Sequence, residues 1–138
     1  MADCIFCKII SGEIPCEKIM DDEYSISFMD VGPLAEGHTL LIPREHYETL
    51  DQVPADVAGR MLKNLPILVN AVQRATDCEG VNVLQNNGTV AHQEVPHVHF
   101  HIIPRNTGDN WQFNWPASKY PAGRMEELAE KIRSEVAV

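Results

Sequence analysis

The stretch HVHFHII at residues 97–103 carries a histidine at every second position. Alternate side chains of a β-strand share one face, so a strand here turns three imidazoles to one side and Val98, Phe100 and Ile102 to a core on the other. Stacked imidazoles need hydrogen-bond partners and repel one another when charged, so a core would gain nothing from them. The stretch therefore predicts a strand that carries a functional site.

Apolar runs bounded by turn residues predict the other strands of a five-stranded sheet. They cover residues 18–20, 24–29, 38–42 and 81–84. The histidine strand is expected to end at Pro104, which has no backbone N–H to donate to a neighbouring strand.

Apolar residues at three- and four-residue steps predict one long helix from Ala55 to Thr76. Pro66 is expected to kink this helix, because it cannot donate a helical hydrogen bond. A short helical turn is expected over residues 4–11 and a last helix over 125–136. Strands and helices do not alternate regularly, so the predicted fold class is α+β on a mostly antiparallel sheet.

The whole chain has the length and composition of one globular domain over residues 1–138, with 44% apolar and 22% charged residues. Its net charge of −9 argues against a nucleic-acid binder, which needs a basic surface. Neither a secretion signal nor an apolar run long enough for a membrane span is visible, so we expect a cytoplasmic protein. In that compartment the four cysteines are expected to be thiols or metal ligands.

Two chemistries suit three aligned histidines. One is metal binding, because neutral imidazole is a common zinc or iron ligand. The other is nucleophilic attack on phosphorus, since the ordinary imidazole pKa of about 6.5 leaves much of the side chain neutral at pH 7. Three histidines of one strand span about 13 Å at about 3.3 Å per residue, so they cannot all bind one metal without help from other strands. A non-catalytic nucleotide sensor is the third alternative, which the intact triad disfavours because binding alone needs no nucleophile.

The stretch at 97–103 resembles the signature of the histidine-triad (HIT) nucleotide hydrolases, His-φ-His-φ-His-φ-φ with φ apolar, at all seven positions. The resemblance extends over residues 4–15, 28–30, 37–44 and 86–105. It implies the HIT-like fold and hydrolysis of a P–N or P–O–P bond at the α-phosphate of a nucleoside phosphoramidate or dinucleoside polyphosphate. The related uridylyltransferases carry His-Pro-His in this strand, so the third histidine favours a hydrolase.

The resemblance also implies roles for single residues. His99 would attack the α-phosphate and form a nucleotidyl-histidine intermediate. His101 would hydrogen-bond the phosphate, and His38 on a neighbouring strand would orient the nucleophile. Asp30 matches the acid that binds the ribose, where a carboxylate suits two hydroxyl groups. This chemistry needs no catalytic metal.

The loop before the triad is expected to bind the phosphate. Asn86 and Gln93 match polar contacts of the family, and the backbone N–H groups around Gln93, Glu94 and Val95 would surround the phosphate. His92 stands where a glycine-like residue is common. Because histidine lacks glycine's freedom at positive φ, we expect a differently shaped loop. Pro96 removes one further backbone donor.

A second site is indicated by Cys4-x-x-Cys7, which has half of the usual spacing of a zinc site. The bacterial branch of the family completes such a site with a histidine after the third strand and with the first triad histidine. These match His46 and His97 and imply a structural zinc ion. The resemblance further implies a purine nucleotide of the adenosine type as ligand and a homodimer as the assembly.

Overall fold

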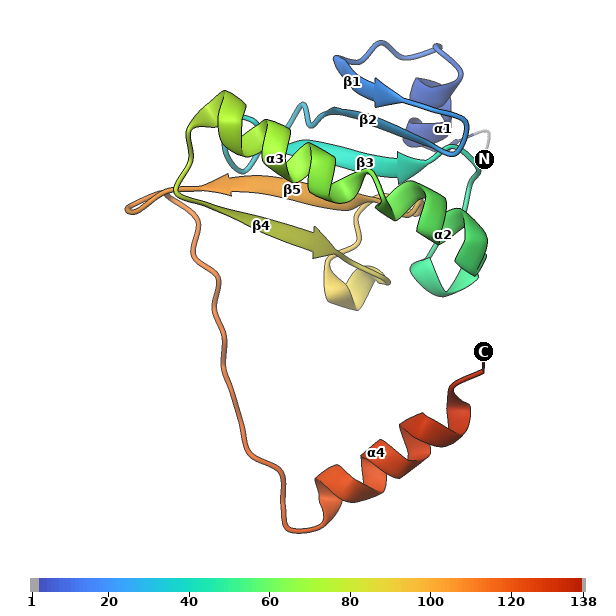
Figure 1. Ribbon diagram of the computed structural model, residues 1–138, viewed down its shortest axis with the longest axis vertical. Helices are drawn as coiled ribbons and strands as arrows, with labels where there is room; N and C mark the ends of the chain where they lie inside the picture. Colours follow the sequence, from blue (N-terminus) through green and yellow to red (C-terminus); the bar gives the residue numbers. More distant parts are fainter. Residues whose placement is uncertain (1–2, 138) are drawn as a thin grey trace.

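The computed structural model describes residues 3–137, in which five antiparallel strands form one sheet (Figure 1). Their order across the sheet is β1-β2-β3-β5-β4. The strands are β1 (Lys18–Asp21), β2 (Ser25–Met29), β3 (Thr39–Pro43), β4 (Gly80–Gln85) and β5 (Phe100–Arg105). Every neighbouring pair is antiparallel, which confirms the predicted α+β fold class and five-stranded sheet.

Helices cover the two faces of the sheet, as Figure 1 shows. The helices α2 (Ala55–Leu62) and α3 (Leu65–Thr76) lie on one face, and the short α1 (Ile5–Ile10) lies on the other. The core is accordingly divided into two clusters. Leu41, Met61, Leu68, Val72, Val98, Phe100 and Ile102 form the cluster under α2 and α3. Cys4, Phe6, Ile26, Phe28, Leu40 and Ile42 form the cluster under α1.

The two-residue period of the histidine stretch is therefore confirmed by burial. Val98, Phe100 and Ile102 pack in the α2–α3 cluster, with 0%, 8% and 0% of their surfaces exposed. The intervening histidines lie on the face that α1 covers. Burial of apolar surface stabilises the fold by about 25 cal/mol per Å². A slip of one residue would exchange the two faces and expose these three side chains, so their burial fixes the register.

The prediction of one helix over residues 55–76 is wrong, because α2 ends at Leu62 and α3 begins at Leu65. Pro66 lies in the first turn of α3, where its missing N–H leaves no helical bond unmade. In a continuous helix the ring of Pro66 would clash with the carbonyl of Leu62. Asn64, at the break, is buried and donates to Asp22 Oδ2 at 2.7 Å and Ser25 Oγ at 3.1 Å, so the interruption is tied to the sheet.

The predicted limits of the histidine strand are also wrong, because β5 begins at Phe100 and runs through Pro104 to Arg105. Residues before Phe100 have no strand opposite them on β4, whose pairing ends at Gln85. They remain extended, and Val98 N–H donates to the carbonyl of Tyr47 at 2.8 Å. Pairing with β3 stops at Ile102, so Pro104 lies where its missing N–H breaks no hydrogen bond of the sheet.

Gly37 permits the close approach of β3 to β5. Its φ of +98° is unfavourable for other residues, and a Cβ there would lie 2.5 Å from Thr76 Cγ2 and 3.2 Å from Pro104 Cγ. Only glycine fits this position, and it places the next residue, His38, immediately before β3.

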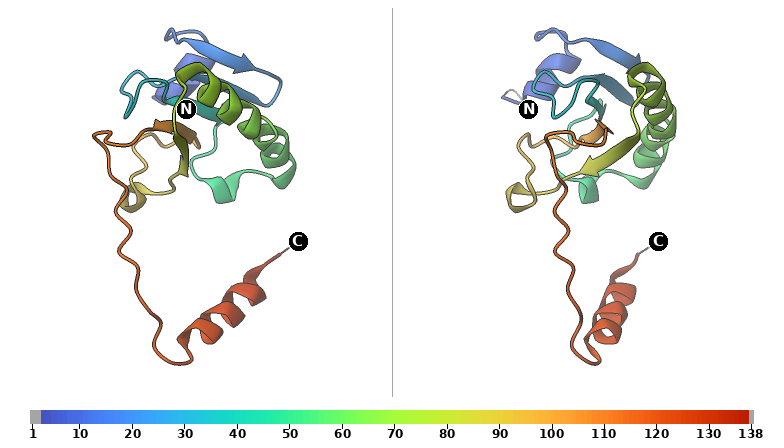
Figure 2. Two further views of the ribbon diagram at one scale, coloured as in Figure 1. Left: turned by 60° about the vertical axis from the view of Figure 1, so that its left-hand side comes forward. Right: turned by 90° about the vertical axis from the view of Figure 1, so that its left-hand side faces the viewer.

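Beyond β5 the chain leaves the sheet as an extended arm and ends in α4 (Arg124–Glu135), as Figure 2 shows. The predicted last helix is thus confirmed. Arg105 holds the base of the arm through Asp109, the carbonyl of Trp111 and the Trp111 ring, 4.3 Å from the guanidinium carbon. Among residues 3–137, none of the helices has both the length and the apolar character that crossing a membrane requires.

Candidate functional site

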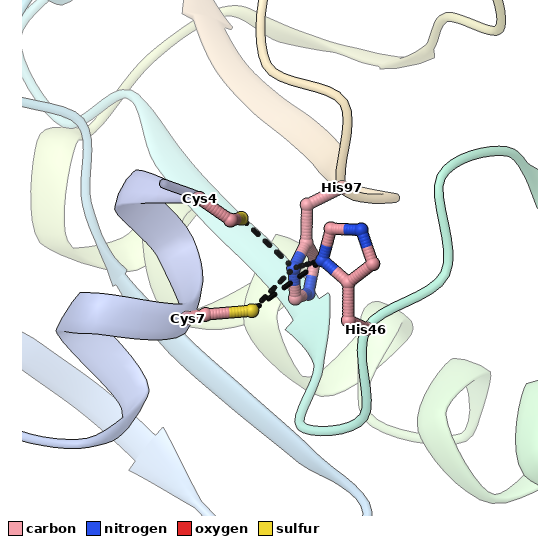
Figure 3. Close-up of side chains that lie close together, drawn as sticks. All are labelled: Cys4, Cys7, His46 and His97. Carbon is pink, nitrogen blue, oxygen red and sulfur yellow. Dashed lines mark hydrogen bonds between the residues drawn. The ribbon is translucent and has the colours of Figure 1, made fainter. Parts of the chain in front are cut away.

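Four side chains from three parts of the chain converge beside the start of β5 (Figure 3). Cys4 and Cys7 come from the α1 segment, His46 follows β3, and His97 comes three residues before β5. Their ligand atoms all lie within 4.8 Å of one another. The structure thus brings together the four residues predicted as metal ligands, and we call them the Cys₂His₂ cluster.

The distances inside the Cys₂His₂ cluster suit a tetrahedral zinc ion. His97 Nδ1 lies 3.5 Å from Cys4 Sγ, 3.7 Å from Cys7 Sγ and 3.2 Å from His46 Nδ1, which in turn lies 3.4 Å from Cys7 Sγ. Zn–S bonds of about 2.3 Å and Zn–N bonds of about 2.0–2.1 Å imply S···N separations of about 3.5 Å and N···N separations of about 3.3 Å. The donor atoms therefore fit a zinc ion.

The protonation states also suit a cation. His97 Nε2 lies 2.9 Å from the carbonyl oxygen of Pro43, so Nε2 carries the hydrogen and Nδ1 directs its lone pair into the cluster. Burial lowers the pKa of His97 to about 4 and also lowers the pKa of His46, so both imidazoles are neutral at pH 7. Burial raises the pKa of the Cys7 thiol, so a thiolate there needs a cation beside it.

His99 is oriented by the backbone of its own triad. Its Nδ1 lies 2.7 Å from the carbonyl oxygen of His97, so Nδ1 carries the hydrogen and Nε2 is left with a free lone pair. Only 5% of the residue is exposed, and this burial lowers the pKa of His99 below its ordinary value. At pH 7 the imidazole is therefore neutral and can attack through Nε2.

A chain of hydrogen bonds fixes the tautomers of the other two histidines. The backbone N–H of Leu34 donates to His38 Nδ1 at 3.1 Å, so His38 carries its hydrogen on Nε2. That nitrogen lies 2.9 Å from His101 Nδ1 and donates to it. His101 is therefore left with a hydrogen on Nε2, which can be given to a ligand. Burial lowers the pKa of His38, and burial together with the neighbouring histidines lowers the pKa of His101 to about 4, so both are neutral at pH 7.

Asp30 lies at the edge of this histidine group. It follows β2, and its backbone N–H donates to the carbonyl of His38 at 3.0 Å. One carboxylate oxygen accepts the N–H of Gly32 at 2.8 Å, and the other lies 3.5 Å from His38 Nε2. The side chain is 22% exposed, so the carboxylate can still accept hydrogen bonds from a ligand.

The tautomers argue against the triad as a set of metal ligands. His97 directs Nδ1 into the Cys₂His₂ cluster, whereas the His99 Nδ1 and the His38 Nε2 carry hydrogens that other groups accept. A metal at Asp30, His38 and His101, whose side chains lie close enough to share one, would have to remove the hydrogen that the Leu34 N–H forces onto His38.

The loop predicted to bind phosphate is held mainly by Gln93. Its side-chain carbonyl accepts the N–H of Gly88 at 2.7 Å, and its amide donates to the carbonyls of Glu48 at 2.7 Å and Val95 at 3.0 Å. Asn86 Nδ2 lies 3.5 Å from the carbonyl of His92. Within residues 3–137, no hydrogen bond joins Gln93 or Asn86 to the triad, and the Gln93 amide is occupied by the carbonyls of Glu48 and Val95.

His92 adopts the conformation that it was expected to avoid, with φ 69° and ψ 27°. The expectation of a loop reshaped to avoid positive φ at this position is therefore wrong. Its ring lines a cavity of about 540 Å³ together with Glu48, Gln93 and Glu94. The carboxylate of Glu94 also lies near enough to His99 to favour the protonated imidazole, although burial outweighs it.

Phe6 was not predicted as a site residue, yet its ring packs against two triad histidines. The ring centroids lie 5.1 Å from His99 and 5.8 Å from His97. The available signal was its place inside Cys4-x-x-Cys7, because residues between two ligands are carried to the metal site with them. Three backbone groups were also missed, the carbonyls of Pro43 and His97 and the N–H of Leu34.

Known proteins are similar to this chain in sequence. The family model described as the HIT domain matches residues 11–108. An adenosine 5′-monophosphoramidase of Schizosaccharomyces pombe is 43% identical over 138 residues, which cover 96% of this chain and 98% of that protein. An adenylylsulfatase of Arabidopsis thaliana is 45% identical over 107 residues, covering 78% of this chain and 54% of that protein.

Solved structures agree with the fold. The crystal structure of a member of the HIT family from Bacillus subtilis matches with a TM-score of 0.93 and 34% identity over 99% of both chains. The predicted resemblance is confirmed by the family match, the relatives and this structure together. The chain belongs to the histidine-triad (HIT) family.

Proposed function

We propose that this protein hydrolyses the P–N bond of a nucleoside 5′-phosphoramidate at the α-phosphate, with His99 as the nucleophile. The observation that carries the proposal is the 2.7 Å hydrogen bond from His99 Nδ1–H to the carbonyl of His97, which leaves Nε2 unprotonated. A neutral imidazole with one fixed tautomer is prepared to attack phosphorus. The relative named an adenosine 5′-monophosphoramidase supports the substrate class.

The reaction has two steps. His99 Nε2 attacks the α-phosphorus, a new P–N bond forms, and the bond from phosphorus to the substrate nitrogen breaks. Water then attacks the nucleotidyl-histidine, the bond from phosphorus to His99 breaks, and the nucleoside monophosphate leaves. In the first step the leaving nitrogen takes up a proton from solvent as its bond to phosphorus breaks. In the second step the hydroxyl of the attacking water ends on phosphorus and its proton returns to solvent, so one water is consumed for each P–N bond broken.

His101 is the proposed phosphate donor, through the Nε2–H that its bond with His38 leaves free. His38 would act on the reaction indirectly, by holding His101 in this tautomer. Donors fixed before the reaction stabilise charge that develops on phosphate oxygens without a cost of reorganisation. No step uses a metal.

Asp30 is the proposed ribose-binding residue, since its partly exposed carboxylate lies beside His38 and suits a diol. The backbone N–H groups around Gln93, Glu94 and Val95, with Asn86, are the proposed remaining phosphate contacts. The bonds that the Gln93 side chain makes to Gly88 and Val95 of its own loop support a role in shaping that loop. An adenosine-type nucleotide is expected, in keeping with the adenosine named for the S. pombe relative.

A structural zinc ion is proposed for the Cys₂His₂ cluster. Two cysteines and two neutral imidazoles complete a tetrahedron and leave no position for water, so such an ion would stabilise the fold and would not activate a nucleophile. It would hold α1 against the start of β5. The homodimer and the cytoplasmic location expected from the sequence stay predictions, as does the single domain over residues 1–138.

The test is release of AMP from adenosine 5′-phosphoramidate by the purified protein with EDTA present. The native protein is expected to turn over and His99→Ala is expected to be inactive, whereas His92→Ala, a histidine outside the triad, retains turnover. Activity that disappears with EDTA while the fold persists would favour a metal-dependent hydrolase. No release by the native protein would move the test to dinucleoside polyphosphates, and failure there would favour a non-catalytic sensor.

A further inference from the structure

We propose that Phe6 is a positioning residue for His99, and that the Cys4-x-x-Cys7 segment exists in part to hold its ring there. The inference rests on the proposed role of His99 as the nucleophile. Phe6 would touch neither the phosphate nor the leaving group. It would act by keeping the nucleophilic imidazole in the one orientation that presents Nε2 to phosphorus.

The ring of Phe6 is enclosed on several sides by other rings. It meets His99 edge to face, with centroids 5.1 Å apart and planes at 83°, and meets His97 at 5.8 Å and 77°. Phe28 lies 5.6 Å away at 72°. Only 7% of Phe6 is exposed. The residue therefore spans the first two histidines of the triad from the α1 side of the sheet.

The imidazole of His99 is bounded by Phe6 on one side and by His101, whose centroid lies 4.8 Å away, on another. Among residues 3–137, the one side-chain hydrogen bond that holds it runs from Nδ1 to the carbonyl of His97. One hydrogen bond fixes one ring atom and leaves the ring free to tilt about it. The neighbouring rings remove that freedom by close packing, which is the role we assign to Phe6.

The position of Phe6 depends in turn on the cysteines around it. The helix α1 has six residues, too few to be stable alone, so its place comes from tertiary contacts. Cys4 and Cys7 direct their sulfur atoms to His97 and His46, as Figure 3 shows. The Cys₂His₂ cluster is thus linked to the nucleophile by two routes, the carbonyl of His97 and the ring of Phe6.

The test compares Phe6→Leu and Phe6→Ala with Ile26→Ala, a truncation of a buried residue in the same core cluster. We expect Phe6→Ala to lower kcat about 10- to 100-fold, in line with the cost of misplacing a reacting group by about 1 Å. KM should change less than kcat. Phe6→Leu restores volume without an aromatic edge and should give an intermediate kcat, whereas Ile26→Ala should lower stability and keep kcat.

A second readout does not depend on turnover. Nitrogen-15 and carbon-13 relaxation spectra of the imidazoles should show a rigid His99 ring in the native protein and in Ile26→Ala, and a ring that tilts about its Nδ1–H bond in the Phe6 variants. A higher KM with unchanged kcat would show that Phe6 contacts the substrate, which would overturn the proposal. A His99 ring as rigid in Phe6→Leu and Phe6→Ala as in the native protein would overturn it too. If the native protein shows no turnover, the spectra still decide the positioning role, separately from the proposed function.

Discussion

His38 Nε2 lies 2.9 Å from His101 Nδ1, and the direction of that hydrogen bond is set from outside the pair. The backbone N–H of Leu34 can only donate, and it donates to His38 Nδ1. One backbone group therefore determines which nitrogen of His101 carries a hydrogen, two side chains away. The carbonyl groups of His97 and Pro43 do the same for His99 and His97.

Replacing His38 tests this chain of hydrogen bonds. His38→Phe would leave the Leu34 N–H and His101 Nδ1 without partners, and we expect kcat to fall about 10²-fold, the lower end of what a positioned proton donor contributes. His38→Gln can accept from Leu34 and donate to His101, so it should keep at least about ten times more of the activity. Steady-state rates on adenosine 5′-phosphoramidate measure the difference. Equal rates for the two variants would show that the hydrogen bonds from Leu34 through His38 to His101 have no part in catalysis.

The buried histidines make stability depend on pH. Burial lowers the pKa of His38, and it lowers the pKa of His101 to about 4. The unfolded chain, with an imidazole pKa of about 6.5, thus binds more protons than the folded chain between about pH 4 and pH 6.5. The free energy of unfolding should therefore rise with pH through that window and level off above it.

Urea denaturation at half-unit steps from pH 4.5 to pH 7.5 measures this slope. His101→Gln removes one titrating group, so its slope should be shallower than that of the native protein. Any loss of a bound metal in acid would affect both proteins equally. The difference between their slopes therefore reports the titration of His101 alone. Identical slopes would show that His101 titrates normally in the folded state.

The left-handed backbone of His92 predicts an unusual tolerance to glycine. At φ 69° a side chain costs roughly 1–2 kcal/mol, and glycine removes that cost while making the unfolded chain more flexible by about 0.4–1 kcal/mol. His92→Gly should therefore be as stable as the native protein or slightly more stable. His92→Val, with a β-branched side chain, should be less stable by about 1–2 kcal/mol. Urea midpoints of the three proteins test this, and a clear loss for His92→Gly would contradict it.

The sequence pattern predicts the faces of the sheet better than the ends of its elements. The period of two correctly separates Val98, Phe100 and Ile102 from the histidines, because burial of one face determines the register. The helix break at Asn64 depends on bonds to Asp22 and Ser25, which lie far away in the sequence. No local pattern contains that information.

In the candidate site, too, local sequence predicts some features and distant contacts determine the others. The residue types of the Cys₂His₂ cluster and of the histidine group could be predicted, because they carry the chemistry themselves. Their protonation could not, since it depends on backbone groups of Leu34 and Pro43 that only the fold brings near. Phe6 was missed for a similar reason. Its place between two cysteines puts it beside the metal site, but only the fold shows that its ring packs against His97 and His99.

Disrupting the proposed zinc site is expected to weaken the fold more than replacing a cysteine elsewhere. Cys7→Ser deletes one ligand of the Cys₂His₂ cluster, whereas Cys78→Ser changes a free, partly exposed thiol outside it. Binding of a structural metal is part of the folding free energy, so its loss should cost at least about 3 kcal/mol, or roughly 10 °C in Tm for a chain of this size. Thermal melts, with the zinc content of each purified protein measured by elemental analysis, provide the test. About one zinc per chain in native protein and Cys78→Ser, with little in Cys7→Ser, is the expected result. Equal melting temperatures in all three, or native protein that binds no zinc when it is supplied during folding, would show that the cluster is held by packing alone.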